Sequence, residues 1–276
     1  MKVIVAEYFG ICFGVRDAIA AAEQAAAEGP LTVLGELVHN PVVRERLTMR
    51  GVMEVPVNET PSSARAMITA HGISDVQRER WRATGVQLLD GTCPLVRHAH
   101  TQLRLLVKQG YTPVVIGKAG HVEVVGLTGD FPHAFVIENE DQVKTLPHRP
   151  RFGVISQTTQ PIDRVEQIVS TMRAARPDAD VRFVDTVCKP TKDRQNALRK
   201  LLDQTDTVVV VGGRTSNNTR ELVELVRAER KRAIHVERAG ELSRYDFRGL
   251  SKVGVTAGTS TLRETVEQVV RRLEEF

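Results

Sequence analysis

The feature that most constrains how this chain folds is a segment that occurs three times, each time beginning at a cysteine. Each copy continues with a helical pattern, a strand-like apolar run and a glycine 23 or 24 residues after the cysteine. The cysteine–glycine pairs are Cys12 and Gly35, Cys93 and Gly117, and Cys188 and Gly212. A repeat at this near-constant spacing predicts one supersecondary unit that occurs three times.

Helix boundaries can be located within each copy. The Ala-rich run after Cys12 ends at Gly29-Pro30, which is a helix stop signal. Pro94 and Pro190 each stand where a first helical residue is expected, because the first helical turn leaves that amide unpaired in any case. We expect helices at residues 16–28, 94–110 and 190–205. We expect strands at residues 1–7, 31–34, 66–69, 114–116, 153–156, 208–211 and 253–256.

Strands that alternate with helices predict parallel sheets, and the ligands of such sheets gather at the carboxyl ends of the strands. The expected fold class is therefore α/β, with three units at residues 1–95, 96–190 and 191–276. Packed about a pseudo-threefold axis, each unit would offer one cysteine and its polar loops to a shared centre. The alternative is that any α/β protein shows such periodicity and that the cysteines have no shared role.

Composition excludes several other classes of protein. No stretch approaches the ~18 apolar residues of a membrane span, and Glu7 interrupts the first apolar run before a signal-peptide core can form. Three widely spaced cysteines argue against a disulfide framework and for a reduced compartment, so we expect a cytoplasmic protein. A formal charge of +4 with only 4% aromatic residues argues against nucleic-acid binding and suits an anionic small molecule or an acidic protein partner.

The position of the three cysteines indicates metal binding. Each stands at an expected helix start, where the helix dipole stabilises the thiolate that binds metals. Three thiolates around one centre suit zinc with a water, or an iron–sulfur cube in which one iron lacks a protein ligand. The chain has no C-x-x-C pair, which argues against a zinc ribbon or a two-cluster ferredoxin.

Polar loops follow the expected strands. They carry histidines, hydroxyls and amides, which donate hydrogen bonds and suit a phosphate or diphosphate. These loops lie at residues 38–41, 70–74, 117–123, 156–159, 212–219 and 257–260. They lack the residue order of a nucleotide-binding P-loop. Any single histidine among them can be a structural residue, but together they favour an anion site.

Glu123 is the single carboxylate within these loops. Surrounded by donors and a metal centre, it could be the proton source for a leaving hydroxyl group. The alternative is a surface glutamate without a chemical role.

Nine short motifs run from the first expected strand to the last. They are GICFGV at 10–15, VHN at 38–40, AHG at 70–72, GTCP at 91–94, GHVE at 120–123, QTT at 157–159, DTVC at 185–188, SNN at 216–218 and AGTS at 257–260. In identity, order and spacing they resemble the 4-hydroxy-3-methylbut-2-enyl diphosphate reductases, the last enzymes of the non-mevalonate isoprenoid pathway. The resemblance covers essentially the whole chain.

The resemblance implies a trefoil of three α/β units around a central [4Fe-4S] cluster with one iron not ligated by protein. The reaction implied is a two-electron reductive dehydroxylation that gives isopentenyl and dimethylallyl diphosphates, with electrons from a ferredoxin- or flavodoxin-type carrier. The cluster ligands would be Cys12, Cys93 and Cys188, and the proton donors Glu123 and Thr158. The substrate would be held by His39, His71, His121, Ser216, Asn217, Asn218 and Ser260.

The chain departs from the family pattern at a few positions. Asn217 stands where a second serine is usual, Gly91 replaces an alanine, and Ile11 replaces an aromatic residue. Thr261-Leu262 follows Ser260 where a proline is common. None of these changes removes a cluster ligand or the proton donor, but they leave room for a paralogue that acts on a related allylic diphosphate.

Two other classes of function account for some of these features. A non-enzymatic iron–sulfur electron carrier or sensor explains the cysteines but not Glu123 or the loop histidines. A zinc-bound structural or RNA-associated protein is disfavoured by the low aromatic content and by the absence of C-x-x-C pairs.

Overall fold

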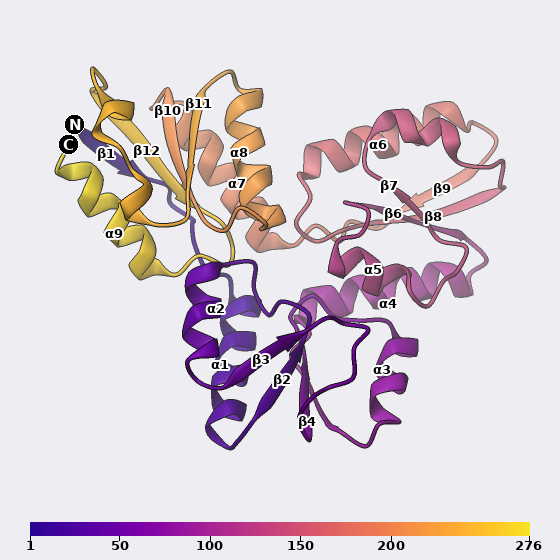
Figure 1. The fold of residues 1–276 in the computed structure, drawn as a ribbon. Coiled ribbons are helices and arrows are strands. Elements are labelled where there is room, and N and C mark those ends of the chain that lie inside the picture. The colour runs from indigo at the N-terminus through magenta and orange to yellow at the C-terminus, as the bar shows by residue number, and fades with distance from the viewer. The chain divides into compact units, whose positions relative to one another are not determined.

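A computed structural model describes residues 1–276 and contains three parallel four-stranded sheets, called here sheets A, B and C (Figure 1). Sheet B has the strand order β3-β2-β4-β5, and sheet C has the order β7-β6-β8-β9. Sheet A has the order β11-β10-β12-β1, so the first strand of the chain occupies the position that β5 and β9 occupy in the other two. The predicted α/β fold class with three parallel-sheet units is confirmed.

The elements of the sheet B unit follow one another without interruption. Its strands are β2 (Leu31–Leu34), β3 (Val52–Val55), β4 (Arg65–Ile68) and β5 (Gln87–Asp90). The helices in this stretch are α1 (Phe13–Ala27), α2 (Pro41–Thr48) and α3 (Asp75–Arg82). The expected helix at 16–28 and the expected strands at 31–34 and 66–69 are therefore confirmed, with α1 starting directly after Cys12.

The sheet C unit repeats the arrangement. Its strands are β6 (Thr112–Ile116), β7 (Phe135–Ile137), β8 (Arg151–Ser156) and β9 (Asp180–Phe183). Its helices are α4 (Pro94–Lys108), α5 (Val122–Thr128) and α6 (Ile162–Ala175), with a 3-10 turn, η1 (Glu140–Thr145). The predicted helix after Cys93 begins at Pro94, as its missing amide suggests.

The sheet A unit joins the two ends of the chain. Its strands are β1 (Lys2–Val5), β10 (Thr207–Val211), β11 (Arg232–Val236) and β12 (Lys252–Ala257). Its helices are α7 (Lys189–Leu202), α8 (Asn217–Ala228) and α9 (Arg263–Glu274), with 3-10 turns η2 (Ala239–Glu241) and η3 (Arg244–Phe247).

Burial on both faces explains why the inner strands are almost entirely apolar. In β10, Val208 and Val210 pack with α7 and α8, whereas Val209 and Val211 pack with α9 on the other face. All four valines are fully buried. Side chains alternate between the faces of a strand, so a sheet covered by helices on both sides needs apolar residues at every position.

The chain forms two compact bodies. Body 1 comprises residues Met1–Arg16, Val38–Met49 and Lys189–Phe276, and it contains sheet A. Body 2 comprises Asp17–Leu37 and Arg50–Cys188, and it contains sheets B and C. The three-unit division at residues 95 and 190 stays a prediction. One strand of the predicted first unit, β1, pairs with β12 of the predicted third unit, with Val3 opposite Val253. No helix of the chain is both long enough and apolar enough to cross a lipid bilayer.

Candidate active site

The three cysteines occupy equivalent positions in the fold. Each comes after the strand that ends the sheet order, β1, β5 or β9, and directly before a helix, α1, α4 or α7. Each backbone amide donates to a carbonyl in the loop that follows the neighbouring strand of the same sheet. The bonds run from Cys12 to Thr259 (3.1 Å), from Cys93 to Ala70 (3.0 Å) and from Cys188 to Thr158 (2.9 Å). The predicted equivalence of the cysteines is thus a structural equivalence, and none of them forms a disulfide.

In body 1, the loop that carries Cys12 is held from two sides. On one side, Gly10 donates its amide to Ala257 and Cys12 donates to Thr259, both at the end of β12. On the other side, the buried guanidinium of Arg194 in α7 donates to the Gly10 carbonyl from Nε (3.0 Å) and Nη2 (2.5 Å). Gly10 has a φ of +70°, a conformation that glycine adopts without strain.

The polar loops of body 1 meet the same segment. Ser216 caps α8, accepting from the Thr219 amide at 3.3 Å. In the first turn of that helix, Asn218 accepts through Oδ1 from the Thr259 amide at 3.0 Å. Asn40 caps α2 and donates through Nδ2 to the Ser260 carbonyl at 2.9 Å. Asn218, Asn40 and Cys12 are therefore all bonded to one loop, residues 257–261.

Three donors in this region are buried without a partner: Asn218 Nδ2, Thr219 Oγ1 and Ser260 Oγ. Asn218 is 3% exposed and Ser260 is 5% exposed, yet the Asn218 Nδ2 and Ser260 Oγ atoms make no hydrogen bond. Buried polar groups are normally satisfied, so unpaired donors at a helix start indicate a missing acceptor. The predicted residues Ser216, Asn217 and Asn218 surround this helix start, and an anion supplies such acceptors.

His39 is the remaining predicted residue of body 1. It precedes the cap of α2, and its carbonyl lies against the backbone of Gly213 so closely that a Cβ at Gly213 would overlap it. Gly213 thus brings the His39 backbone to the loop that leads to Ser216.

In body 2, two predicted histidines face each other. His71 lies in the loop after β4, and His121 caps α5, accepting through Nδ1 from the Glu123 amide at 3.1 Å. Their rings are 5.6 Å apart, in an edge-to-face arrangement at 81°. The Oγ1 of Thr69 lies 3.3 Å from the Nδ1 of His71. The two loops therefore present a pair of imidazoles.

Glu123 follows His121 in the first turn of α5 and is not a surface residue. The residue is only 1% exposed, so the alternative that Glu123 is a surface glutamate is wrong. Desolvation raises the pKa of Glu123 to about 7, although the hydrogen bonds from Thr158 act in the opposite direction. A carboxyl group that titrates near neutral pH is suited to giving a proton to a leaving group.

Thr158 connects Glu123 with a cysteine. Its amide donates to Glu123 Oε1 at 2.7 Å, and its hydroxyl donates to Oε2 at 3.1 Å. Its carbonyl accepts from the Cys188 amide. The predicted pair Glu123 and Thr158 is thus joined through one backbone unit to the predicted metal ligand Cys188.

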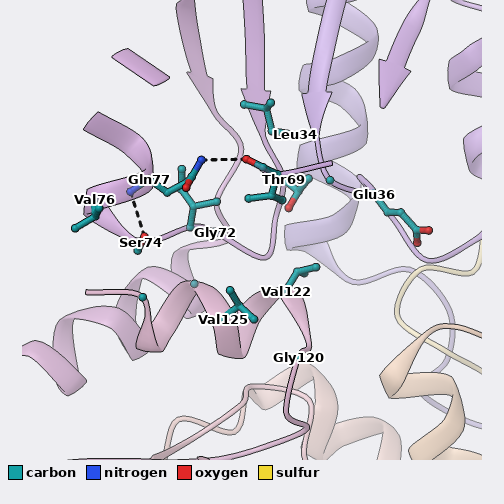
Figure 2. A pocket seen from close by; sticks show the side chains of 15 residues that line it. Leu34, Glu36, Thr69, Gly72, Ser74, Val76, Gln77, Gly120, Val122 and Val125 are labelled. Atoms are coloured by element: carbon teal, nitrogen blue, oxygen red, sulfur yellow. Dashed lines mark hydrogen bonds between the residues drawn. The ribbon is translucent and has the colours of Figure 1, made fainter. Parts of the chain in front are cut away.

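A pocket of about 440 Å³ opens beside these loops, between the end of β4 and α5 (Figure 2). Thr69, Gly72, Gly120 and Val122 line it, but the predicted residues His71, His121 and Glu123 do not. Its wall is mainly apolar, and its single charged residue is the acidic Glu36. A diphosphate needs donors and cations, so this pocket is not the predicted anion site.

Sequence reasoning missed two residues of this region. Asn40 belongs to a recognised motif, but its link to Ser260 depends on a contact between distant segments. Arg194 was not singled out, although it is spaced with Leu198 and Leu201 on the apolar face of α7. That periodicity is the signal that could have identified a buried arginine.

The comparisons with known proteins show which family the chain belongs to. The sequence model described as "LytB protein" matches residues 3–274. The chain belongs to the LytB protein family. Among curated proteins, the 4-hydroxy-3-methylbut-2-enyl diphosphate reductase of Trichlorobacter lovleyi is 35% identical to this LytB chain, covering 100% of the chain and 98% of that protein. The protein of the same name from Aquifex aeolicus is 34% identical, covering 100% and 97%.

Solved structures resemble this LytB chain as well. The E-1-hydroxy-2-methyl-but-2-enyl-4-diphosphate reductase from Plasmodium falciparum has a TM-score of 0.91 and 27% identity, covering 98% of this chain and 87% of that one. A structure titled (E)-4-hydroxy-3-methyl-but-2-enyl diphosphate reductase, the terminal enzyme of the non-mevalonate pathway, has a TM-score of 0.69 and 32% identity over 100% of both chains.

Proposed function

We propose that this LytB chain is a 4-hydroxy-3-methylbut-2-enyl diphosphate reductase, acting in the cytoplasm. The observation that carries the proposal is the buried Glu123, held by Thr158 next to the metal-ligand candidate Cys188. A carrier or sensor without substrate chemistry has no need of a buried carboxyl group with a pKa near 7 beside its metal ligands.

The proposed reaction balances as follows. The allylic C–O bond of the substrate breaks, a C–H bond forms, and the oxygen leaves as water. Two electrons and two protons are consumed, and the product is isopentenyl or dimethylallyl diphosphate. The reaction therefore needs a source of electrons, a source of protons and a hold on the diphosphate.

Cys12, Cys93 and Cys188 would hold a [4Fe-4S] cluster. The donor set fits this group: three cysteines, none in a disulfide, at three equivalent helix starts. When bound, such a cluster supplies electrons and an iron without a protein ligand, which acts as a Lewis acid toward the substrate oxygen. A ferredoxin- or flavodoxin-type protein would bring the electrons.

Seven side chains are the proposed donors to the diphosphate. Those of body 1 are His39, Ser216, Asn217, Asn218 and Ser260. The unpaired Nδ2 of Asn218 and Oγ of Ser260 support this role, because a buried donor without an acceptor costs stability until a ligand supplies one. His71 and His121 would contribute from body 2. Asn217 has donors of its own, so its replacement of the usual serine preserves the chemistry.

Glu123 would deliver a proton to the departing oxygen. Burial keeps its carboxyl group protonated up to a pH of about 7, and Thr158 fixes the orientation of the group through both of its oxygens. The protonated acid is thus available at neutral pH without a rearrangement of the site.

The test is anaerobic purification followed by an assay with a reduced dye and the hydroxylated diphosphate. A brown protein that oxidises the dye only when substrate is present, and whose Cys188→Ser variant loses both colour and turnover, is the expected result. A brown protein without turnover would point to a carrier or to a paralogue for a related allylic diphosphate. A protein that stays colourless after iron–sulfur reconstitution would overturn the proposal.

A further inference from the structure

The two segments that meet at the Cys12 loop have an unusual charge. Residues 1–16 and 189–202 together contain seven lysine or arginine residues and two acidic residues, whereas the whole chain has a formal charge of only +4. These thirty residues therefore have a formal charge of +5, which exceeds the +4 of the whole chain. Positive charge gathered in one region attracts an acidic partner and speeds its arrival.

Part of this charge forms a stripe along α7. Lys189 and Lys200 are separated by about three helical turns, which places them on the same side of the helix. Asp193 and Asn196 lie between them on that side, and these four residues are called here the α7 stripe. The side chains of Lys189 and Lys200 are 82% and 71% exposed. Their partners, Asp193 and Glu7, leave both lysines accessible to solvent.

An exposed aromatic residue lies beside the stripe. Tyr8 is 51% exposed, and it is close enough to Lys189 to interact with it electrostatically. Tyr8 precedes Cys12 by four residues, and Lys189 directly follows Cys188. An exposed tyrosine is typical of a protein-binding surface, because its ring supplies a large contact area and loses little conformational entropy when it is ordered.

The surroundings of Cys93 differ from those of Cys12 and Cys188. Near Cys93, Arg78 and Arg97 both pair with Asp90, at 2.8 and 3.4 Å. Arg104, on the helix that Cys93 begins, pairs with Asp75 at 2.6 Å. The thirty residues 75–104 contain five arginines and three acidic residues, an excess of +2, whereas the thirty residues of the two segments at the Cys12 loop have an excess of +5. Of the two regions, the one that includes the α7 stripe carries the larger excess of positive charge and so complements an acidic protein.

We infer that Tyr8 and the α7 stripe form the docking surface for an acidic electron-carrier protein. This inference rests on the proposed function, which consumes two electrons per substrate. The carrier is oxidised as it gives up these electrons, either as two one-electron carriers in turn or as one two-electron carrier. Docking at Tyr8 and Lys189 places the carrier next to the segments that carry Cys12 and Cys188, so the electrons have a short distance to travel.

The experiment compares two sources of electrons for the same cluster-loaded protein. One arm uses a reduced plant-type ferredoxin, and the other uses dithionite-reduced methyl viologen, which needs no docking surface. The variants are Tyr8→Ala, Lys189→Glu, Lys200→Glu and the combined triple variant. We expect the triple variant to raise the KM for ferredoxin by about tenfold or more, since charges at the rim of an interface control association. Turnover with the dye should stay at the wild-type rate.

Matched controls lie on other surfaces of the chain. Lys144→Glu reverses an equally exposed lysine, and Tyr245→Ala removes a tyrosine that is 72% exposed. Neither should change the KM for ferredoxin. If the controls lower ferredoxin-driven turnover as much as the stripe variants do, or if the triple variant keeps the wild-type KM, the docking surface is wrong.

A binding titration separates this inference from the proposed function. The ferredoxin is titrated into the protein without substrate at low and at physiological ionic strength, and the Kd is measured. We expect the wild-type Kd to rise with salt concentration and the Kd of the triple variant to be about tenfold higher than that of the wild type. This arm decides the inference even if no diphosphate is reduced, and a wild-type protein that does not bind the ferredoxin overturns it. Absence of dye-driven turnover with bound ferredoxin would instead overturn the proposed function.

Discussion

Both carboxylate oxygens of Glu123 accept hydrogen bonds from a single residue, Thr158, whose amide donates at 2.7 Å and whose hydroxyl donates at 3.1 Å. One residue therefore sets the plane of a carboxyl group that is almost completely buried. The same threonine accepts from the Cys188 amide, so the orientation of the acid and the position of the cysteine depend on one backbone unit.

The first prediction concerns the pH dependence of turnover. In the proposed reaction Glu123 acts in its protonated form, and burial raises its pKa to about 7. We expect kcat to be constant below that pH and to fall as the pH rises through 7. Glu123→Gln should lower kcat by about 100-fold or more and remove this dependence. The exposed Glu79→Gln is the matched control. A Glu123→Gln variant with full turnover would show that the proton comes from elsewhere.

The second prediction concerns stability. The pKa of Glu123 is raised from 4.5 to about 7 on folding, so the folded protein holds this proton more tightly than the unfolded chain. The stabilisation is fully present below pH 4.5 and is lost as the pH rises to 7. Between pH 4 and pH 8, the wild type should lose about 3 kcal/mol of unfolding free energy relative to Glu123→Gln. Urea titrations at both pH values measure this difference, and equal pH dependence of the two proteins would contradict the burial of an ionisable acid.

A third prediction separates the roles of the two polar atoms of the Asn218 side chain, Oδ1 and Nδ2. Asn218→Asp keeps an acceptor for the Thr259 amide but replaces the unpaired Nδ2 donor with a negative charge. We expect the protein to fold normally and the Kd for inorganic diphosphate to rise about 100-fold. Calorimetric titration measures the Kd, with the exposed Asn196→Asp as the control. Unchanged diphosphate binding in Asn218→Asp would remove Asn218 from the anion site.

A fourth prediction uses two glycines of the sheet A unit. A methyl group at Gly213 would overlap the His39 carbonyl, whereas one at Gly240 meets no atom within 4 Å. Gly213→Ala should therefore displace His39 and lower kcat/KM on the order of 100-fold, the usual cost of misplacing a binding group by about 1 Å. Gly240→Ala should keep wild-type kinetics. Equal kinetics in the two variants would show that His39 does not need its observed position.

A fifth prediction concerns Arg194. Arg194→Met leaves the carbonyls of Gly10 and Pro190 without the donors they have in the wild type. We expect a loss of about 2–4 kcal/mol of unfolding free energy, because buried acceptors lose charged partners. The control is Arg272→Met, which removes an exposed arginine paired with Glu275. Similar urea midpoints for the two variants would argue that Arg194 does not secure the Cys12 loop.

Local patterns were sufficient to predict the elements that begin each repeat. Pro94 opens α4, the Ala-rich run gives α1, and the valines of β10 form a strand, since each signal depends on neighbouring residues only. Helix α9 could also have been predicted, because Val266, Val269 and Leu273 mark a regular apolar face. The strand β7 could not, since its three residues carry too short a pattern.

The candidate site residues also divide into those that local patterns predict and those that depend on contacts between distant segments. Loop position and residue type were enough to single out Glu123 and the polar loop at 212–219, because strand ends of parallel sheets collect polar residues. The prediction for Asn218 itself rests on the family resemblance. The burial of Glu123 was not predictable, since it depends on Thr158 from a loop 35 residues away. The link from Asn40 to Ser260 joins segments 220 residues apart, a distance at which local periodicity carries no information.

The place of β1 has a consequence for how the protein is made. A ribosome delivers Lys2–Val5 some 250 residues before the strand against which they pair, Lys252–Ala257. Sheets B and C lie wholly within one continuous stretch and can form as they are synthesised. The loop of Cys12, in contrast, has no Thr259 carbonyl to hold it until residue 259 has been synthesised. In a nascent chain, Cys12 is therefore the last of the three cysteines to gain the carbonyl that its amide bonds, although it is the first to be synthesised.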